Sequence, residues 1–305
     1  MEYIALGTSA SYPTSAMGAP SGLLVRGNQS ILLDCGEGTS HQLARAKRPI
    51  QKISYIWISH SHLDHYLGVA GIAWYLDLLK AKEAIKIFAD SSTLNNVKTL
   101  LELSRLKQFN PSLISVAPGI FYEDVSFVLR AFELRHTIPC FGLALEENPS
   151  KHFQPELADK FGIPHGPDRK ALQKGETITL KNGKEIKPEM VLGPPTPGKK
   201  VVYIADTLFH DSLISECEKA DLLICEATYL ERDINLALKY QHMTVTQASL
   251  LAREAKVRNL LLTHLSPRYE LVDIENEATN IFSKTLIARD LQEYQIDSFL
   301  PRNST

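Results

Sequence analysis

Strand-like and helix-like segments alternate along most of this chain of 305 residues. Short runs rich in apolar and β-branched residues, such as 53–58 and 201–205, alternate with segments in which apolar residues recur at helical spacing, such as 66–79 and 274–291. This alternation is typical of α/β proteins, in which helices cover the faces of sheets. We therefore expect an α/β fold with a large apolar core.

The composition argues against several classes of protein. The chain has 33 lysines and arginines against 35 aspartates and glutamates, a formal net charge of −2, which is unlike a basic nucleic-acid-coating protein or an acidic disordered one. The first residues lack the basic and apolar regions of a signal peptide, and the longest apolar stretch, 68–79, is too short to span a bilayer. Four cysteines without a CxxC pair are typical of reduced thiols. We therefore expect a cytoplasmic protein that does not associate with membranes.

One segment, 146–200, differs in character from the rest. It holds eight of the sixteen prolines, and its helix and strand signals are short and broken. It contains ten basic residues against eight acidic ones, and between 169 and 187 the ratio is six to two, whereas the remainder of the chain is net acidic. We therefore predict a single domain over 1–305 from which 146–200 protrudes as an inserted flexible arm.

The motif His60-Ser61-His62-Leu63-Asp64-His65 carries the strongest chemical signal. It follows the predicted strand 53–58 and precedes a predicted helix. Alternate residues of an extended segment project to the same side, so His60 and His62 can bind one cation. Asp64 and His65, at the turn into the helix, can face a second cation, as in two-metal hydrolytic sites. Imidazole and carboxylate ligands together favour zinc over manganese or iron. The alternative is a polar loop with surface histidines.

Two metal shells need further ligands, and three candidates directly follow predicted strands. They are His136 after the extended segment 125–134, Asp206 after 201–205, and His264 after 259–263. The carboxyl ends of strands in open α/β sheets converge on one edge. Each residue alone is more commonly a turn or capping residue, but all three fit one metal site.

With these motifs the chain resembles the ribonuclease Z family of the metallo-β-lactamase superfamily, endonucleases that remove the 3′ trailer from precursor tRNA, and in particular its short form. The resemblance covers essentially the whole chain and includes, besides HxHxDH, Leu6-Gly7-Thr8-Ser9-Ala10, Leu33-Asp34-Cys35-Gly36-Glu37-Gly38-Thr39 and Thr263-His264-Leu265-Ser266-Pro267-Arg268-Tyr269. Two features are more specific to the family: Glu226-Ala227-Thr228 paired with His242-Met243-Thr244, and Gly162-Ile163-Pro164-His165-Gly166-Pro167 inside the predicted arm.

The resemblance implies a fold and a set of metal ligands. The fold would be a metallo-β-lactamase-like αββα sandwich, and the cofactor two Zn²⁺ ions per subunit. One zinc ion would be held by His60, His62 and His136. The other would be held by Asp64, His65 and His264, with Asp206 bridging the two.

The resemblance also implies the catalytic residues. Asp64 would be the general base that orients the attacking water. Glu226 would position His242 and raise its basicity, and His242 would protonate the departing 3′ oxygen. The products would be a tRNA with a 3′ hydroxyl and a trailer with a 5′ phosphate. A structural alternative exists for this pair, with Glu226 as a cap at a strand end and His242 as a cap of the helix that begins near Thr244.

For the partners, the resemblance implies precursor tRNA as the substrate and a homodimer as the assembly. The residues that would contact the RNA are Arg268 and the basic residues of the arm, Arg169, Lys170, Lys174, Lys181, Lys184 and Lys187. Lysines and arginines on a surface of matching shape bind double-helical RNA through its backbone. A run of charge this modest is more commonly a solvated face.

Two other functions compete with a tRNA endonuclease. One is a hydrolase of the same fold that acts on small phosphodiesters, thioesters or sulfate esters; the arm and the pair of Glu226 and His242 argue against it. The other is a non-catalytic RNA-binding subunit. The complete ligand set argues against that one, because buried ligand residues without a metal would be unpaired polar groups.

Overall fold

The computed structural model describes residues 1–81, 85–299 and 301–302. The chain divides into two compact units. Unit 1 comprises Met1–Glu123, Leu129–Leu145 and the chain from Lys200 onward, and unit 2 comprises Asp124–Val128 and Glu146–Lys199. Among the described residues, no helix has both the length and the apolar character needed to cross a membrane.

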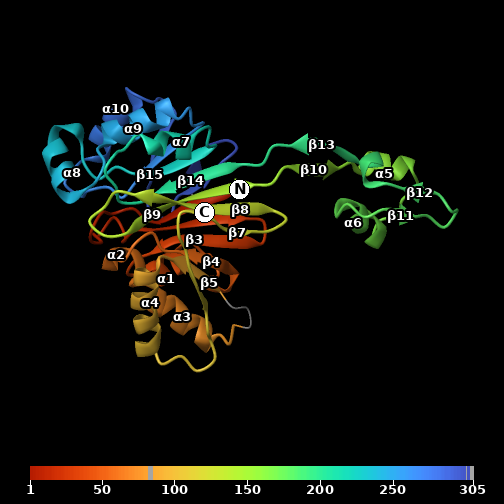
Figure 1. The fold of residues 1–305 in the computed structure, drawn as a ribbon, viewed down its shortest axis with the longest axis horizontal. Helices are drawn as coiled ribbons and strands as arrows, with labels where there is room; N and C mark the ends of the chain where they lie inside the picture. Colours follow the sequence, from red (N-terminus) through yellow and green to blue (C-terminus); the bar gives the residue numbers. More distant parts are fainter. Residues whose placement is uncertain (82–84, 300, 303–305) are drawn as a thin grey trace. The chain divides into compact units, whose positions relative to one another are not determined.

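Two large mixed sheets form the centre of unit 1 (Figure 1). In the described residues the first sheet has the order β19 (Pro301–Arg302), β18 (Glu293–Gln295), β1 (Glu2–Gly7), β2 (Ser21–Arg26), β3 (Gln29–Cys35), β4 (Ile53–Trp57), β5 (Lys86–Ala89) and β6 (Ser112–Ser115). The second has the order β17 (Thr285–Ile287), β16 (Leu260–Thr263), β15 (Leu222–Glu226), β14 (Lys200–Ile204), β9 (Cys140–Glu147), β8 (Phe127–Leu134) and β7 (Gly119–Glu123).

Helices cover the outer face of each sheet (Figure 1). Beside the first sheet lie α1 (Thr39–Arg45), α2 (Leu63–Tyr66), α3 (Val69–Leu78) and α4 (Ser91–Leu103), with the short 3₁₀ turn Ile50–Lys52. Beside the second lie α7 (Ser212–Cys217), α8 (Ile234–Tyr240), α9 (Val245–Glu254) and α10 (Leu271–Thr279), with the 3₁₀ turn Glu231–Asp233. The predicted α/β fold is confirmed.

Both sheets contain a run of parallel strands, and the central strands of the second sheet are buried on both faces. Strands β3 to β6 are parallel, as are β14 to β17, with Val201 opposite Leu222 and Leu223 opposite Leu260. Every residue of β15 and β16 is buried. Such strands are continuously apolar because a layer covers each face. Parallel pairing also places their carboxyl ends at the same edge of the sheet.

The predicted helix 66–79 is divided in two by Gly68. The Gly68 amide donates to the Cys35 carbonyl at 2.8 Å. A Cβ atom on Gly68 would lie 2.1 Å from the Gly36 oxygen, so no other residue permits this close approach. Gly68 thereby holds the end of α2, and with it the HxHxDH motif, against the end of β3.

The predicted helix 274–291 was wrong over its second half. Helix α10 ends at Thr279, and Thr285–Ile287 forms β17, which pairs with β16. Its β-branched residues Thr285 and Ile287 are buried in the sheet. Tertiary pairing therefore overrides the helical spacing of apolar residues in this segment.

Unit 2 is a small folded unit with a core of its own. Its elements are β10 (Ser150–Phe153), α5 (Pro155–Lys160), α6 (Pro167–Gln173), β11 (Ile178–Thr179), β12 (Glu185–Ile186), the 3₁₀ turn Pro188–Met190 and β13 (Leu192–Thr196). Strands β10 and β13 pair, as do β11 and β12. Five residues form the buried apolar cluster, Ala158, Ile163, Leu172, Ile186 and Val191. Short elements with proline at the start of each helix account for the broken signals in the sequence.

Candidate metal centre

The residues predicted to bind metal all lie in connections that follow strands of unit 1. His60 and His62 follow β4, and Asp64 and His65 belong to α2. From the second sheet, His136 follows β8, Asp206 follows β14, and His264 follows β16. The structure brings them, together with His242, into three groups. Within each group the potential ligand atoms lie within 4.8 Å of one another: His60, His62, His136 and Asp206; Asp64, His65 and His264; and Asp206, His242 and His264.

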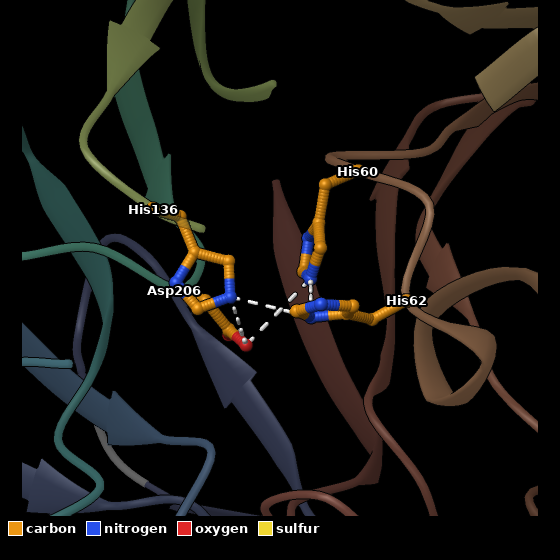
Figure 2. Close-up of side chains that lie close together, drawn as sticks. All are labelled: His60, His62, His136 and Asp206. Carbon is orange, nitrogen blue, oxygen red and sulfur yellow. Dashed lines mark hydrogen bonds and ion pairs between the residues drawn. The ribbon is translucent and has the colours of Figure 1, made fainter. Parts of the chain in front are cut away.

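The first group points inward from three connections, as Figure 2 shows. The Nε2 atoms of His60 and His136 lie 3.0 and 3.2 Å from Nδ1 of His62. The same Nε2 atoms lie 3.7 and 3.8 Å from Oδ2 of Asp206. Because zinc binds nitrogen and oxygen at about 2.0–2.2 Å, atoms at these separations can surround one ion.

The second group also contacts Asp206, through His65 and His264. Nε2 of His65 lies 3.6 Å from Oδ2 of Asp64 and 3.6 Å from Oδ2 of Asp206. Nε2 of His264 lies 3.3 Å from Oδ1 of Asp206. The two oxygens of one carboxylate therefore face ligands of both groups, which is the geometry that a bridging aspartate needs.

Three buried atoms in these groups lack a hydrogen-bond partner among the described residues. They are Nε2 of His65, Oδ1 of Asp206 and Nε2 of His264. A buried polar atom without a partner is unfavourable by about 1–3 kcal/mol. Imidazole nitrogen and carboxylate oxygen are also common ligands of zinc in proteins. The residues present therefore fit a metal centre.

Asp34 supports this centre, although its place in the sequence did not predict a role. Its fully buried carboxylate accepts hydrogen bonds from the Ser59 amide at 2.8 Å, the Ser59 hydroxyl at 2.9 Å and the Tyr203 hydroxyl at 2.7 Å. Nδ1 of His65 lies 2.7 Å from the same carboxylate. This interaction fixes the His65 ring so that Nε2 faces the metal site. The signal in the sequence was a charged residue within an otherwise largely apolar strand.

Replacement of Asp34 by Asn is expected to weaken metal binding by about 10- to 100-fold, as loss of a ligand's supporting carboxylate does elsewhere. The amide keeps the size of the side chain but removes the negative charge that orients His65. Competition with a chromogenic chelator measures the affinity. Asp90→Asn is the matched control, since Asp90 is a buried carboxylate that caps α4. An equal loss of affinity in both variants would contradict the assignment.

Three further candidate ligand histidines are oriented by hydrogen bonds at Nδ1. Nδ1 of His60 lies 2.9 Å from the Ser59 hydroxyl, and Nδ1 of His136 lies 3.0 Å from the Gln241 carbonyl. Nδ1 of His264 lies 2.9 Å from the Thr228 hydroxyl. Each of these rings can donate through Nδ1 and keep Nε2 free as a ligand. His264 also adopts a left-handed backbone conformation, with φ 53°.

The charges within the centre are mutually stabilised. Burial opposes ionisation of Asp206, but the adjacent His264, His65 and His242 outweigh it and hold its pKa well below the usual range. Burial likewise opposes a charge on His65, but the carboxylates of Asp206 and Asp34 raise its pKa well above the usual value. For His60, burial dominates and lowers the pKa, which favours the neutral imidazole that binds metal.

Glu226 and His242 form a buried pair beside the centre. Nδ1 of His242 lies 3.1 and 3.2 Å from the two carboxylate oxygens of Glu226. Glu226 also accepts hydrogen bonds from the Thr207 amide and the Thr228 hydroxyl, each at 2.7 Å. Burial disfavours a charge on His242, but the Glu226 carboxylate outweighs it and raises the pKa of His242 to about 9. The pair can therefore hold a proton at His242.

The structural alternative for His242 does not hold, because Thr244 caps the helix. The Thr244 hydroxyl accepts from the Gln247 amide at 3.1 Å, and the Gln247 side chain accepts from the Thr244 amide at 3.0 Å. This reciprocal pair is a capping box. Glu226 does accept a hydrogen bond from a backbone amide, that of Thr207, but it contacts His242 at the same time.

A cavity of about 530 Å³ opens over the metal site. It is lined by side chains of the ligand groups, by His242, and by Ser11, Thr137, Tyr229, Lys239, Tyr240 and Arg268. The predicted substrate-binding residue Arg268 is exposed at this cavity. Lys239 was not identified from the sequence, where it stands as an isolated charge in helix α8.

The other predicted substrate-binding residues lie in unit 2, and one of them is placed differently from the rest. Lys170, Lys174, Lys181, Lys184 and Lys187 are exposed. Arg169 is buried: it donates to the Ile163 carbonyl and forms an ion pair with Asp159. Its guanidinium therefore stabilises unit 2, and we leave Arg169 out of the RNA-binding set.

Comparisons with known proteins identify relatives over the whole length. A family model described as "Anti-Pycsar protein Apyc1" matches residues 1–113, and one described as "Beta-lactamase superfamily domain" matches residues 187–265. A ribonuclease Z of Crocosphaera subtropica is 36% identical in an alignment that covers 100% of both chains. A ribonuclease Z of Methanosarcina mazei is 35% identical over 97% of this chain and 98% of the relative.

The fold has a match among solved structures. The crystal structure of human tRNase Z, short form, superimposes with a TM-score of 0.72 at 24% identity and covers 97% of this chain and 99% of the human one. This likeness confirms the metallo-β-lactamase fold. Taken with the identity to full-length relatives, the motifs in the sequence and the ligand groups in the structure, it follows that the chain belongs to the ribonuclease Z family.

Proposed function

We propose that this protein is a metal-dependent endoribonuclease that removes the 3′ trailer from precursor tRNA and leaves a 3′ hydroxyl on the tRNA and a 5′ phosphate on the trailer. The observation that carries this proposal is a double one. Two ligand groups lie against Asp206, and His242, which Glu226 holds, lines the same cavity. Hydrolysis of a phosphodiester uses both a metal centre and a proton donor, because the attacking water must be activated and the leaving oxygen must be protonated.

The metal in this proposal is zinc, with two ions per subunit. His60, His62 and His136 would hold one ion, and Asp64, His65 and His264 would hold the other, with Asp206 as a ligand to both. Two zinc ions there would neutralise charge on the scissile phosphate and acidify a water near neutral pH. The support for zinc is the donor set of imidazoles and carboxylates. The support for two ions is that the candidate ligands form two separate groups, and that His264 of the second group faces Oδ1 of Asp206.

The protein's own residues then divide the proton transfers between them. The Asp64 side chain is 18% exposed at the cavity, so it can accept the proton of the attacking water. His242 is held by Glu226 through Nδ1, so its Nε2 is the nitrogen available to donate to the departing 3′ oxygen. Removal and donation by separate groups is the arrangement that general acid–base catalysis requires.

The test is cleavage of a precursor tRNA that carries a 3′ trailer by the zinc-loaded protein. We expect a single cut that yields a tRNA with a 3′ hydroxyl. An intact precursor together with hydrolysis of bis(p-nitrophenyl) phosphate would indicate the alternative hydrolase of small phosphodiesters. Tight binding of the precursor with no hydrolysis of either substrate would indicate the non-catalytic RNA-binding alternative.

For substrate binding we propose that unit 2 is an exosite for tRNA. Lys170, Lys174, Lys181, Lys184 and Lys187 are exposed on it, and Lys184 lies over the Phe161 ring with its nitrogen 4.8 Å from the ring centre. Replacement of all five lysines by Gln is expected to lower kcat/KM for precursor tRNA and to leave hydrolysis of bis(p-nitrophenyl) phosphate unchanged. The slope of binding against salt should fall by about 0.7–0.9 for each phosphate that the protein no longer neutralises.

The control for the exosite is an equal number of lysines removed from unit 1. Exposed lysines suitable for this are Lys52, Lys80, Lys98, Lys219 and Lys256. Equal losses of affinity in the two variants would mean that unit 2 contributes only to the overall charge. The buried Arg169 is left unchanged in both, so that unit 2 keeps its internal ion pair.

We also propose that two copies form a homodimer through the outer face of α3. Trp74, Tyr75 and Leu78 are 48%, 44% and 57% exposed, and with Gly71 they lie at helical spacing on one face. Trp74→Lys is expected to weaken dimerisation by about 30-fold or more, since aromatic residues that become buried in an interface dominate its binding energy. Sedimentation velocity measures the change. Leu103→Lys, at an exposed leucine in α4, is the control, and a monomeric wild type would contradict the proposal.

A cytoplasmic location is consistent with this function and with the cysteines. Cys35, Cys140, Cys217 and Cys225 are all free and buried. Burial raises the pKa of each thiol, which keeps it protonated and unreactive. Such thiols suit a reducing compartment.

A further inference from the structure

A second, smaller cavity adjoins the cavity over the metal site. It has a volume of about 280 Å³ and is lined by residues 10–12, residues 266–268, Thr228 and Tyr229. Ser11, Tyr229 and Arg268 line both cavities, so the two meet along these side chains. This volume is close to the roughly 300 Å³ at which pockets for small ligands begin. The cavity can therefore hold one nucleotide but not a longer stretch of RNA.

The walls of the second cavity are fixed by the fold. The Ala10 amide donates to the Leu265 carbonyl at 3.0 Å, and the Leu265 amide donates to the Thr8 carbonyl at 2.8 Å. The Ser9 hydroxyl donates to the Tyr12 carbonyl at 2.7 Å, and Ser11 has a φ of 64°. Non-glycine residues persist in this left-handed region only where their surroundings impose it. The cavity is therefore formed before any ligand arrives.

The side chains of the second cavity offer flat surfaces and one positive charge. The Arg268 guanidinium carbon lies 5.6 Å from the centre of the Tyr229 ring and 6.0 Å from that of Tyr269. Arg268 is exposed, and Tyr12 is 59% exposed. Nucleobases stack on aromatic rings and on guanidinium planes, and arginine stacked on an aromatic ring is held ready for this.

The position of His242 gives the cavity an orientation relative to the cut. The Tyr229 ring lies between the two cavities, and its centre is 6.0 Å from the centre of the His242 ring. In the proposed function His242 protonates the departing 3′ oxygen, which belongs to the last nucleotide kept on the tRNA. That nucleotide must therefore lie on the His242 side of the scissile phosphate, against Tyr229.

The surrounding charges point to stacking as the means of recognition. The loop 13–20 next to Tyr12 contains no lysine or arginine. At the two cavities the cationic side chains other than histidines are Lys239, which lines only the first, and Arg268, which lines both. A base held by stacking is accepted regardless of its identity, because every base has an aromatic face.

We propose that the second cavity is the subsite for the last retained nucleotide of the tRNA, whose base stacks on Arg268 with Tyr229 behind it and Tyr12 at the entrance. The subsite rests on the proposed function and extends it. It fixes the nucleotide after which the chain is cut without reading its sequence.

The experiment is a double-mutant cycle between the enzyme and the substrate. Precursor tRNA is prepared with a normal or an abasic last retained nucleotide. Each substrate is cleaved by wild type and by Arg268→Lys, a change that keeps the positive charge but removes the planar guanidinium group. Wild type is expected to lose about 5- to 100-fold in kcat/KM on the abasic substrate, the range for one stacked base. Arg268→Lys should show a comparable loss on the normal substrate and little further loss on the abasic one.

A second readout does not depend on cleavage. Fluorescence anisotropy measures binding of mature tRNA ending at the same nucleotide, normal or abasic, to the same proteins. We expect the abasic end to bind more weakly to wild type and equally to Arg268→Lys. Arg253→Lys is the control, since Arg253 is exposed on α9 and pairs with Glu254, and it should behave as wild type.

Three outcomes separate the subsite from the function. Equal binding and cleavage of normal and abasic ends by wild type would overturn the subsite. Coupling of Arg268 to the base of the first trailer nucleotide, in place of the last retained one, would overturn its orientation and with it the proposal. Failure of wild type to cut the precursor, with the base-dependent binding intact, would overturn the proposed function and leave the subsite standing.

Discussion

Asp206→Ala is expected to abolish cleavage of precursor tRNA and to remove bound metal from the protein. Asp206 contacts residues of both ligand groups, with Oδ1 3.3 Å from His264 and Oδ2 3.6 to 3.8 Å from His60, His65 and His136. The loss of metal affinity should exceed the roughly 10- to 100-fold expected for a supporting residue such as Asp34. Metal content after dialysis, measured by mass spectrometry, gives the result.

The control for this variant is Asp211→Ala, an exposed aspartate that precedes α7 in the same connection. It should retain both metal and activity. If Asp206→Ala kept its metal and cut precursor tRNA as wild type does, the bridging role would be wrong. A circular dichroism spectrum shows whether the variant has folded, so a loss of metal is not confused with a loss of structure.

His242→Gln is expected to lower kcat on precursor tRNA by about 10²- to 10⁴-fold, the usual contribution of a general acid. On bis(p-nitrophenyl) phosphate the same change should cost less than about 10-fold, because p-nitrophenolate departs without a proton whereas a ribose oxygen does not. Metal content should stay unchanged. The comparison of two leaving groups therefore isolates proton donation from every other role of the side chain.

Two results would contradict this role. An equal loss on both substrates would show that His242 acts before the leaving step. A loss of bound metal would place His242 among the ligands, since its nitrogen lies within 4.8 Å of ligand atoms of Asp206 and His264. His41→Gln, in the exposed part of α1, is the matched histidine control. Glu226→Gln should follow the pattern of His242→Gln, because Glu226 is the partner that holds the proton there.

The clustering of the candidate ligands could be predicted from the sequence because residues such as His136, Asp206 and His264 each follow a strand. A strand end is a local feature, and parallel pairing alone brings the ends of β14, β15 and β16 to one edge. The role of Asp34 was not accessible, because it depends on hydrogen bonds with Tyr203 of the other sheet and with His65. Arg169 shows the same limit, since a basic residue in a charged run is indistinguishable in sequence from one that is buried against Asp159.

The proposed ligands of the metal centre come from both sheets of unit 1. His60, His62 and His65 belong to the first sheet's side of the centre, whereas His136 and His264 follow strands of the second. Cations bound there would cross-link the two halves of the sandwich, so folding and metal uptake become one linked equilibrium. The protein would then gain stability with the logarithm of free metal above the dissociation constant. Scarcity of metal would thus reduce the amount of folded enzyme as well as its activity.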